Sequence, residues 1–280
     1  MKKIGFVDYY LSEWHANNYP AWIEEANQAL GSDYRVSFGW AETDISPRDG
    51  KSTAQWCEKY GVTPCRTLAE LCEKSDAILI LAPSDPDKHL SYAEQVLPYG
   101  KPTYIDKTFA PDLATAKSIF MLADKHGTPM FSSSALRYAT ELEEIAGSRR
   151  LAVTGSGRSA EEYIVHQVEM VVKVLGTGAE RVRAEQMGLL TVFEIGYGDD
   201  RAATMTYAPN ALPFTLLAEG GEKPRWRQIG SGFFPLLITD ILRFFESGTP
   251  PFDATQTLEV MSIREAALKA AQAPGEWVTL

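Results

Sequence analysis

The stretch from Asp76 to Gly127 reads DAILILAPSDPDKHLSYAEQVLPYGKPTYIDKTFAPDLATAKSIFMLADKHG. Its apolar runs and helical periodicities alternate, and Pro and Gly separate them. The pattern predicts strands over 76–82 and 102–105, each followed by a helix, over 87–97 and 113–126, with a further strand from Pro129 to Ser132. Strands that alternate with helices form a parallel sheet wound by right-handed crossovers.

The residues before this stretch continue the same rhythm. Apolar strands are predicted over Lys3–Val7 and Tyr34–Trp40, and a helix over Pro20–Leu30, with its proline in the first turn and Gly31 just past its end. Shorter helices are predicted over 52–60 and 68–74. Residues 1–134 therefore predict an α/β domain with a Rossmann-like doubly wound parallel sheet.

The pattern changes after about Ser134. Helices are predicted over 165–175, 233–246 and 253–273, and residues 181–207 alternate like antiparallel strands around the turn Gly198-Asp199-Asp200. We predict a second, smaller α+β domain over residues 135–280, with a mainly antiparallel sheet, that contributes to substrate binding and oligomerisation.

Composition excludes several classes of function. The formal net charge is −10, from 27 basic and 37 acidic residues, which argues against a nucleic-acid partner. No apolar run approaches the length of a membrane span, and Asp8 and Glu13 interrupt the N-terminal apolar stretch before it could serve as a signal peptide. Cys57, Cys65 and Cys72 fit neither a disulfide framework nor a paired zinc site. A cytoplasmic protein is expected.

Several motifs resemble the Gfo/Idh/MocA family of oxidoreductases. The strand that ends in Ala82-Pro83, the helix that carries His89, and Asp106-Lys107-Thr108 after a Gly-Lys strand follow the family's order and spacing. Glu162 to Glu169 (EYIVHQVE) resembles the family's Asp-x-x-x-His-x-x-Asp helix. The resemblance implies a small-molecule enzyme that oxidises a sugar, cyclitol or related polyol with NAD or NADP.

The resemblance assigns chemistry to three residues. Lys107 at a strand end would polarise the reacting oxygen, His166 would exchange its proton, and Glu162, one helical turn earlier, would orient His166. Read without the family, Lys107 would be a solvated lysine and His166 a histidine on a buried helix.

The motifs also differ from the family pattern. Asp106 replaces the usual Glu, Glu162 the usual Asp and Thr108 the usual Pro. The acidic side chains at positions 106 and 162 therefore differ in length from those of the family, which changes where their carboxylates lie. His15 and His89 are expected to line the substrate site, although a loop role for His15 and helix packing for His89 remain open alternatives.

The strongest departure follows the first strand. A Rossmann loop carries three glycines so that backbone can approach the pyrophosphate, and this chain has Asp8, Tyr10 and Glu13 in their place. An acidic group about 4 Å from a phosphate costs about 4 kcal/mol at an effective dielectric of 20. The cofactor contacts expected nonetheless come from Asp8, Tyr10, Ser12, Glu42, Pro83 and Asp106.

Two functions therefore remain. The first is an NAD(P)-dependent dehydrogenase that acts on CH–OH groups, with a narrower variant in which transient redox serves elimination or hydrolysis. The second is a non-redox ligand-binding or regulatory member that has lost the dinucleotide. The strands of the second domain favour a homodimer or homotetramer, because an exposed sheet face is commonly covered by another subunit.

Overall fold

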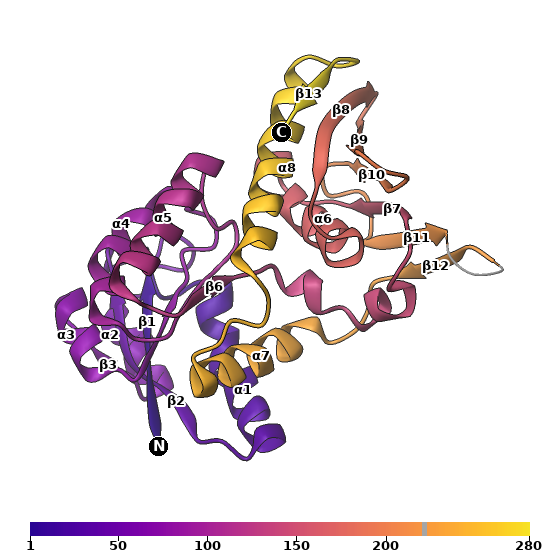
Figure 1. The fold of residues 1–280 in the computed structure, drawn as a ribbon. Coiled ribbons are helices and arrows are strands. Elements are labelled where there is room, and N and C mark those ends of the chain that lie inside the picture. The colour runs from indigo at the N-terminus through magenta and orange to yellow at the C-terminus, as the bar shows by residue number, and fades with distance from the viewer. Residues whose placement is uncertain (220–222) are drawn as a thin grey trace. The chain divides into compact units, whose positions relative to one another are not determined.

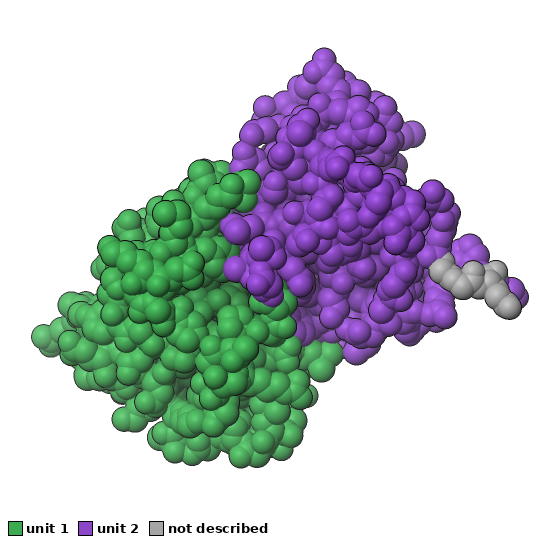
Figure 2. Space-filling view, in the orientation of Figure 1, with its two compact units in different colours: residues 1–133, 234–252 green, residues 134–233, 253–280 purple. Residues whose placement is uncertain are grey.

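The computed structural model describes residues 1–219 and 223–280. The chain forms two compact units, residues 1–133 with 234–252 and residues 134–233 with 253–280 (Figure 2). The linear division did not predict that residues 234–252 return to the first unit, where Phe244 and Phe252 pack against Phe131 at ring-centroid distances of 4.9 and 5.9 Å.

The first unit contains a six-stranded sheet in the order β3-β2-β1-β4-β5-β6, and every pair in it is parallel. Its strands are β1 (Lys2–Asp8), β2 (Tyr34–Ala41), β3 (Thr63–Pro64), β4 (Ala77–Ile80), β5 (Thr103–Ile105) and β6 (Met130–Ser132). The four residues of β4 are all buried, as expected for a strand inside a parallel sheet. The predicted Rossmann-like sheet is confirmed.

Helices connect these strands as the crossovers require (Figure 1). They are α1 (Trp14–Leu30), α2 (Thr53–Tyr60), α3 (Leu68–Lys74), α4 (Asp87–Val96) and α5 (Leu113–His126), with a 3₁₀ turn η1 (Leu97–Tyr99) after α4. The returning segment adds α7 (Phe233–Ser247), which connects no strands of this sheet. Their ends show ordinary capping. Ser52 and Gln55 form a capping box on α2, and Asp112 caps α5.

Helix α1 differs from the prediction. It begins at Trp14 rather than Pro20, so Pro20 lies inside it. A proline inside a helix removes one backbone hydrogen bond, and the sequence rule therefore places it in the first turn. The helix starts earlier because Glu13, a residue type rarely considered as an N-cap, accepts the free N–H groups of its first turn.

The second unit contains a seven-stranded sheet in the order β12-β11-β7-β10-β9-β8-β13. The strands are β7 (Arg150–Gly155), β8 (Ala179–Met187), β9 (Leu190–Tyr197), β10 (Ala202–Tyr207), β11 (Thr215–Glu219), β12 (Arg225–Gln228) and β13 (Trp277–Thr279). Within this second sheet, β7 and β10 are the only strands that pair in parallel among the described residues. The predicted mainly antiparallel sheet is confirmed.

Helices α6 (Ala160–Leu175) and α8 (Ala254–Gln272) pack against one another and against this sheet, and two 3₁₀ turns, η2 (Ala135–Tyr138) and η3 (Thr140–Ile145), precede it. Val168, Val171 and Val172 of α6 are fully buried in the apolar core between helix and sheet. No helix in the described part of the chain is long and apolar enough to cross a membrane.

Candidate active site

The order of the parallel sheet reverses between β1 and β4, and open α/β sheets bind ligands at the carboxyl ends of such a strand pair. Asp8 ends β1, and its Oδ1 accepts hydrogen bonds from the N–H groups of Tyr9 (2.7 Å) and Ala82 (3.1 Å). Its other oxygen is buried without a hydrogen-bond partner. A carboxylate of the chain itself therefore lies at the switch point, where a glycine would leave room for a ligand.

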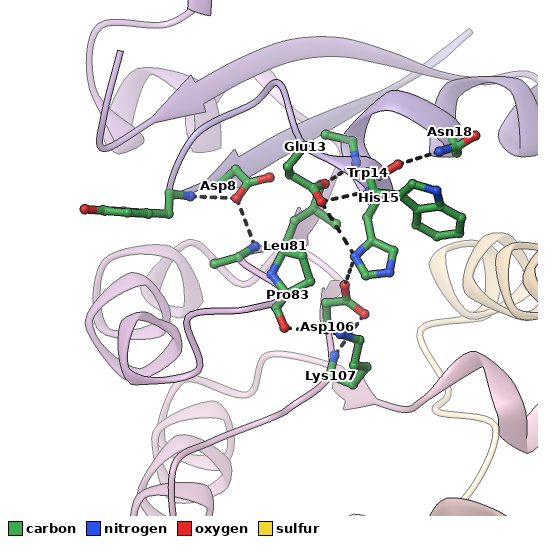
Figure 3. Close-up of polar contacts among 12 residues, drawn as sticks. Asp8, Glu13, Trp14, His15, Asn18, Leu81, Pro83, Asp106 and Lys107 are labelled. Atoms are coloured by element: carbon green, nitrogen blue, oxygen red, sulfur yellow. Dashed lines mark hydrogen bonds and ion pairs between the residues drawn. The ribbon is translucent and has the colours of Figure 1, made fainter. Parts of the chain in front are cut away.

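Glu13 occupies the N-terminus of α1. Its carboxylate accepts hydrogen bonds from the N–H groups of His15, at 2.8 Å, and of Ala16, and the residue is only 3 % exposed (Figure 3). Leu11 lies so close to Gly39 that a Cβ added to this glycine would meet Leu11 Cδ1 at 2.9 Å. The donors that bind pyrophosphate in a glycine-rich loop are thus taken by Glu13. These residues do not fit a pyrophosphate in that position.

The other residues predicted to bind the cofactor around this loop also have partners within the chain. Ser12 Oγ donates to Asp49 Oδ2 at 2.9 Å, and the Tyr10 hydroxyl accepts from Arg48 Nε at 3.1 Å. Glu42, the acidic residue after β2, was also predicted to bind the cofactor. Its carboxylate accepts hydrogen bonds from Lys88 Nζ at 2.5 Å and from the Tyr92 hydroxyl at 2.8 Å. A ribose that approached Glu42 would have to compete with both donors.

Asp106 and His15 come together although 91 positions separate them in the sequence. His15 Nδ1 lies 3.0 Å from Asp106 Oδ2 and 3.9 Å from Glu13 Oε2, so two carboxylates flank one imidazole nitrogen (Figure 3). The other oxygen of Asp106 accepts from the Tyr104 hydroxyl (3.2 Å) and from the Lys107 N–H (2.8 Å). Asp106 is thereby held firmly at the end of β5.

Burial governs the protonation of these three carboxyl groups. Removal from water raises the pKa of Glu13 to about 7 and that of Asp106 to about 6, although hydrogen bonds and Lys107 oppose the two shifts. The pKa of Asp8 also lies well above its ordinary value, because of burial and the nearby Glu13. The cluster therefore carries less negative charge near neutral pH than its composition suggests.

Lys107 follows Asp106 at the carboxyl end of β5, where the sequence placed it. Its Nζ donates to the carbonyl oxygen of Pro83 at 3.2 Å, and the Lys107–Thr108 peptide bond is cis. Pro83, predicted to contact the cofactor, thus positions the lysine through its backbone. A partly buried ammonium at this edge of the sheet can stabilise negative charge on a ligand oxygen.

His89 is fully buried on α4. Its Nε2 lies 2.6 Å from the carbonyl oxygen of Leu81 and its Nδ1 lies 3.0 Å from that of Phe109. Burial lowers the pKa of its imidazole against the opposing effect of these carbonyls. Both ring nitrogens lie against backbone carbonyl oxygens in the interior, which favours the packing alternative over a role in lining the site.

His166 lies on α6 in the second unit and has a partner that the sequence did not predict. Its Nδ1 is 2.6 Å from the hydroxyl oxygen of Ser134, a fully buried residue just before η2. The Tyr163 and Phe214 rings lie 5.7 and 5.9 Å from the imidazole. No periodicity marks Ser134 as a functional residue, because its contact with α6 arises only in the folded unit.

The two acidic residues around His166 differ in their surroundings. Glu162 is partly buried and pairs with the more exposed Arg158 at 2.5 Å. Glu169 is buried, and its carboxylate accepts from the N–H of Ser134 at 3.0 Å and from Arg137 Nη1 at 3.1 Å. Burial raises the pKa of Glu169, and Arg137 opposes the shift. This buried ion pair gives Glu169 a structural role, while orientation of His166 by Glu162 stays a prediction.

None of the described residues forms a group of three or more His, Cys, Asp or Glu side chains suited to a metal ion. The acidic cluster of the first unit is held instead by backbone N–H groups, a tyrosine and a histidine. Its donors and acceptors suit proton exchange and hydrogen bonding to hydroxyl groups.

A family model described as "Oxidoreductase family, NAD-binding Rossmann fold" matches residues 21–133. The match starts after the acidic loop and includes β5 with Lys107. No curated protein matches the chain at a significant level.

Solved structures resemble the whole chain in fold. A putative myo-inositol dehydrogenase from Sinorhizobium meliloti 1021 superimposes with a TM-score of 0.79 at 12% identity, over 100% of this chain and 99% of that one. UDP-N-acetylglucosamine 3-dehydrogenase from Acidithiobacillus ferrooxidans gives 0.78 at 12% identity, over 98% and 97%. GenD2 from gentamicin A biosynthesis, solved in complex with NAD, gives 0.77 at 14% identity, over 100% and 97%. At sequence identities of 12–14%, this similarity shows a shared fold alone.

Proposed function

We propose, from the membership of residues 21–133 in the Gfo/Idh/MocA family of NAD-binding oxidoreductases, that this chain is an NAD(P)-dependent oxidoreductase acting on a sugar, cyclitol or related polyol. The observation that carries the proposal is Lys107 at the carboxyl end of β5, held by Pro83 beside the switch point of the sheet. The neighbours that act on myo-inositol and on a nucleotide sugar support this substrate class.

Oxidation of a secondary alcohol needs a group that accepts the hydroxyl proton and a cation near the developing alkoxide. We assign the first task to His166 and the second to Lys107. His166 suits its task because an imidazole exchanges protons near neutral pH. Glu162, one turn earlier on α6, is proposed to support the imidazolium form.

The hydride acceptor of the family is NAD or NADP. Since Glu13 holds the N-terminus of α1, the phosphates of such a dinucleotide have to be bound by contacts outside this loop, or Glu13 has to leave it. The same observation favours a second candidate, a non-redox member that binds a polyhydroxylated ligand without a dinucleotide.

Isothermal titration calorimetry with NAD⁺, NADH, NADP⁺ and NADPH separates the two candidates. Micromolar binding, followed by cofactor-dependent oxidation within a panel of sugars and cyclitols, supports the dehydrogenase. Absence of heat at millimolar dinucleotide, together with heat from a polyol, supports the non-redox member. The two outcomes exclude one another.

We further propose a cytoplasmic homodimer or homotetramer. Cys57, Cys65 and Cys72 are all free thiols, as expected in a reducing compartment. Helices α6 and α8 pack against the sheet of the second unit, whose edge strands β12 and β13 expose Trp226 and Trp277. A second subunit would cover such a surface. A monomeric mass by light scattering at micromolar concentration would reject the oligomer.

A further inference from the structure

Ser134 makes three contacts within the second unit, two through its Oγ and one through its backbone N–H. Its Oγ lies 2.6 Å from His166 Nδ1 and accepts a hydrogen bond from the N–H of Leu136 at 3.2 Å, and its own N–H donates to Glu169 Oε1 at 3.0 Å. His166 and Glu169 are three residues apart on α6 and share a face. Ser134 is therefore fixed against α6 through two side chains of the same helix.

The anchor on Glu169 is itself rigid. Arg137 Nη1 donates to Glu169 Oε2 at 3.1 Å, and the other guanidinium nitrogen contacts Gln256 of α8. Arg137 and Glu169 are both buried, so the hydrogen bonds among them persist without competition from water. The Ser134 hydroxyl consequently has a fixed position relative to the imidazole of His166.

The 2.6 Å contact fits two proton arrangements: the Ser134 O–H donates to Nδ1, or Nδ1–H donates to Ser134 Oγ. A serine hydroxyl has one proton and two acceptor sites, and Leu136 N–H uses one of the acceptor sites. The remaining acceptor site can take the proton of His166 Nδ1, which leaves the lone pair on Nε2. The same Nδ1–H···Oγ bond remains when Nε2 gains a proton, because an imidazolium donates from both nitrogens.

We propose that Ser134 is a positioning residue for His166, which holds the proton of the neutral imidazole on Nδ1 and so presents Nε2 as the proton acceptor. The proposal rests on the proposed function insofar as Nε2 receives the proton of a substrate hydroxyl. Because a hydroxyl carries no charge, it fixes the ring without the extra negative charge that a carboxylate partner would place there.

Several charged and aromatic groups belong to the elements around the same imidazole. Glu162 lies one turn earlier on α6 and pairs with Arg158, and Glu169 with Arg137 lies behind Ser134. Tyr163 contributes a ring with a titratable hydroxyl from α6, and Phe214 contributes an apolar ring from outside the helix. These groups determine the charge and polarity around the ring. Ser134 determines which ring nitrogen carries the proton when the imidazole is neutral.

The test is ¹⁵N NMR of the histidine side chains in the full-length protein, compared for wild type, Ser134→Ala and Ser134→Thr. The sequence has only four histidines, so a His166→Gln variant assigns the signal. We expect protonated Nδ1 in the neutral ring of the wild type and of Ser134→Thr, and a shift of the proton to Nε2 in Ser134→Ala. Ser133→Ala, at an equally buried neighbouring serine, is the matched control.

Turnover provides the second measurement. Ser134→Ala should lower kcat by about 10- to 100-fold, with KM little changed and the acidic limb of the pH profile displaced, because a misoriented base loses alignment. Ser134→Thr should restore most of kcat. Ser134→Cys keeps a side chain of similar size and replaces the hydroxyl by a thiol, a weaker hydrogen-bond donor and acceptor. This variant replaces Ser134→Ala in both measurements if the alanine variant unfolds.

The proposal is overturned if the neutral wild-type ring carries its proton on Nε2, or if Ser134→Ala leaves both the NMR signals and the pH profile unchanged. If His166→Gln abolishes turnover while Ser134→Ala changes neither readout, the proposed function stands and the positioning role fails. If no polyol is oxidised but the Ser134-dependent NMR shift is present, the positioning stands and the proposed function fails.

Discussion

The carboxylate of Glu13 accepts a hydrogen bond from the backbone N–H of His15 at 2.8 Å. An anion of the chain itself thus sits at the N-terminus of α1, the place where a dinucleotide-binding Rossmann unit holds a phosphate. Asp8 lies on the neighbouring strand end with a raised pKa. We therefore expect the charge of these buried carboxyl groups to oppose a dinucleotide phosphate at this position.

Glu13→Gln should strengthen dinucleotide binding. The amide can still cap α1 through its oxygen but carries no negative charge, so repulsion of a phosphate decreases. We expect the Kd for NAD⁺ at pH 8 to fall at least about tenfold. The repulsion between two like charges about 4 Å apart amounts to several kcal/mol, which is enough for such a change. Calorimetry measures the change, and Glu25→Gln on the exposed face of α1 is the control. An unchanged Kd would mean that any dinucleotide lies elsewhere.

The free energy of unfolding should fall as pH rises from about 4 to about 7. Glu13 and Asp106 have folded-state pKa values of about 7 and about 6, above their ordinary values of 4.5 and 3.8, so the folded chain binds more protons than the unfolded chain in this window. The stabilisation from these two groups is fully present below their ordinary pKa values. It is lost as the pH rises through their raised folded-state pKa values. Each group contributes up to about 1.4 kcal/mol per pH unit.

Urea unfolding at pH 5, 6, 7 and 8 checks this dependence. Glu13→Gln should flatten the slope between pH 5 and pH 7, because the variant has no carboxyl group to titrate. A wild-type curve that rises steadily over the same range would contradict the raised pKa values.

Lys107→Met and His166→Ala should each lower kcat/KM by about 10²- to 10⁴-fold, as expected for loss of a charge stabiliser or of a general base. Both changes keep or reduce side-chain volume, so a matched thermal unfolding curve separates lost chemistry from lost folding. His126→Ala, at the exposed end of α5, is the control and should retain full activity. Wild-type turnover in either active-site variant would reject that residue's role.

Arg137→Met should destabilise the protein by about 3–5 kcal/mol. The change leaves Glu169, only 3% exposed, without its guanidinium partner, and an uncompensated buried carboxylate is costly. The double variant Arg137→Met/Glu169→Leu should recover much of this loss, since it removes both charges. Denaturant unfolding of the two single variants and the double variant measures the coupling. A single-variant loss below about 1 kcal/mol would show that Glu169 is neutral in the folded state.

Parts of the site were predictable because they depend on nearby sequence. The apolar residues of β4 and the proline and glycine signals around β5 place Lys107 at the carboxyl edge of a parallel sheet, and Asp112 and Gly127 mark the ends of α5. The spacing of Glu162, His166 and Glu169 places them on one helix. The start of α1 was not predictable, because Glu13 is an unusual cap and Pro20 normally marks a first turn.

The two sheets and most of the helices could be predicted from the amino-acid sequence, because hydrophobic periodicity and local capping act over a few residues. The roles of Lys107 and His166 came from the resemblance to a family and stay predictions. The folded structure was needed to show which distant groups meet: Asp106 faces His15, Ser134 faces His166, and the segment from Phe234 to Phe252 returns to the first unit. Such contacts join residues far apart in the chain, and they follow from the burial of side chains together, which no local pattern records.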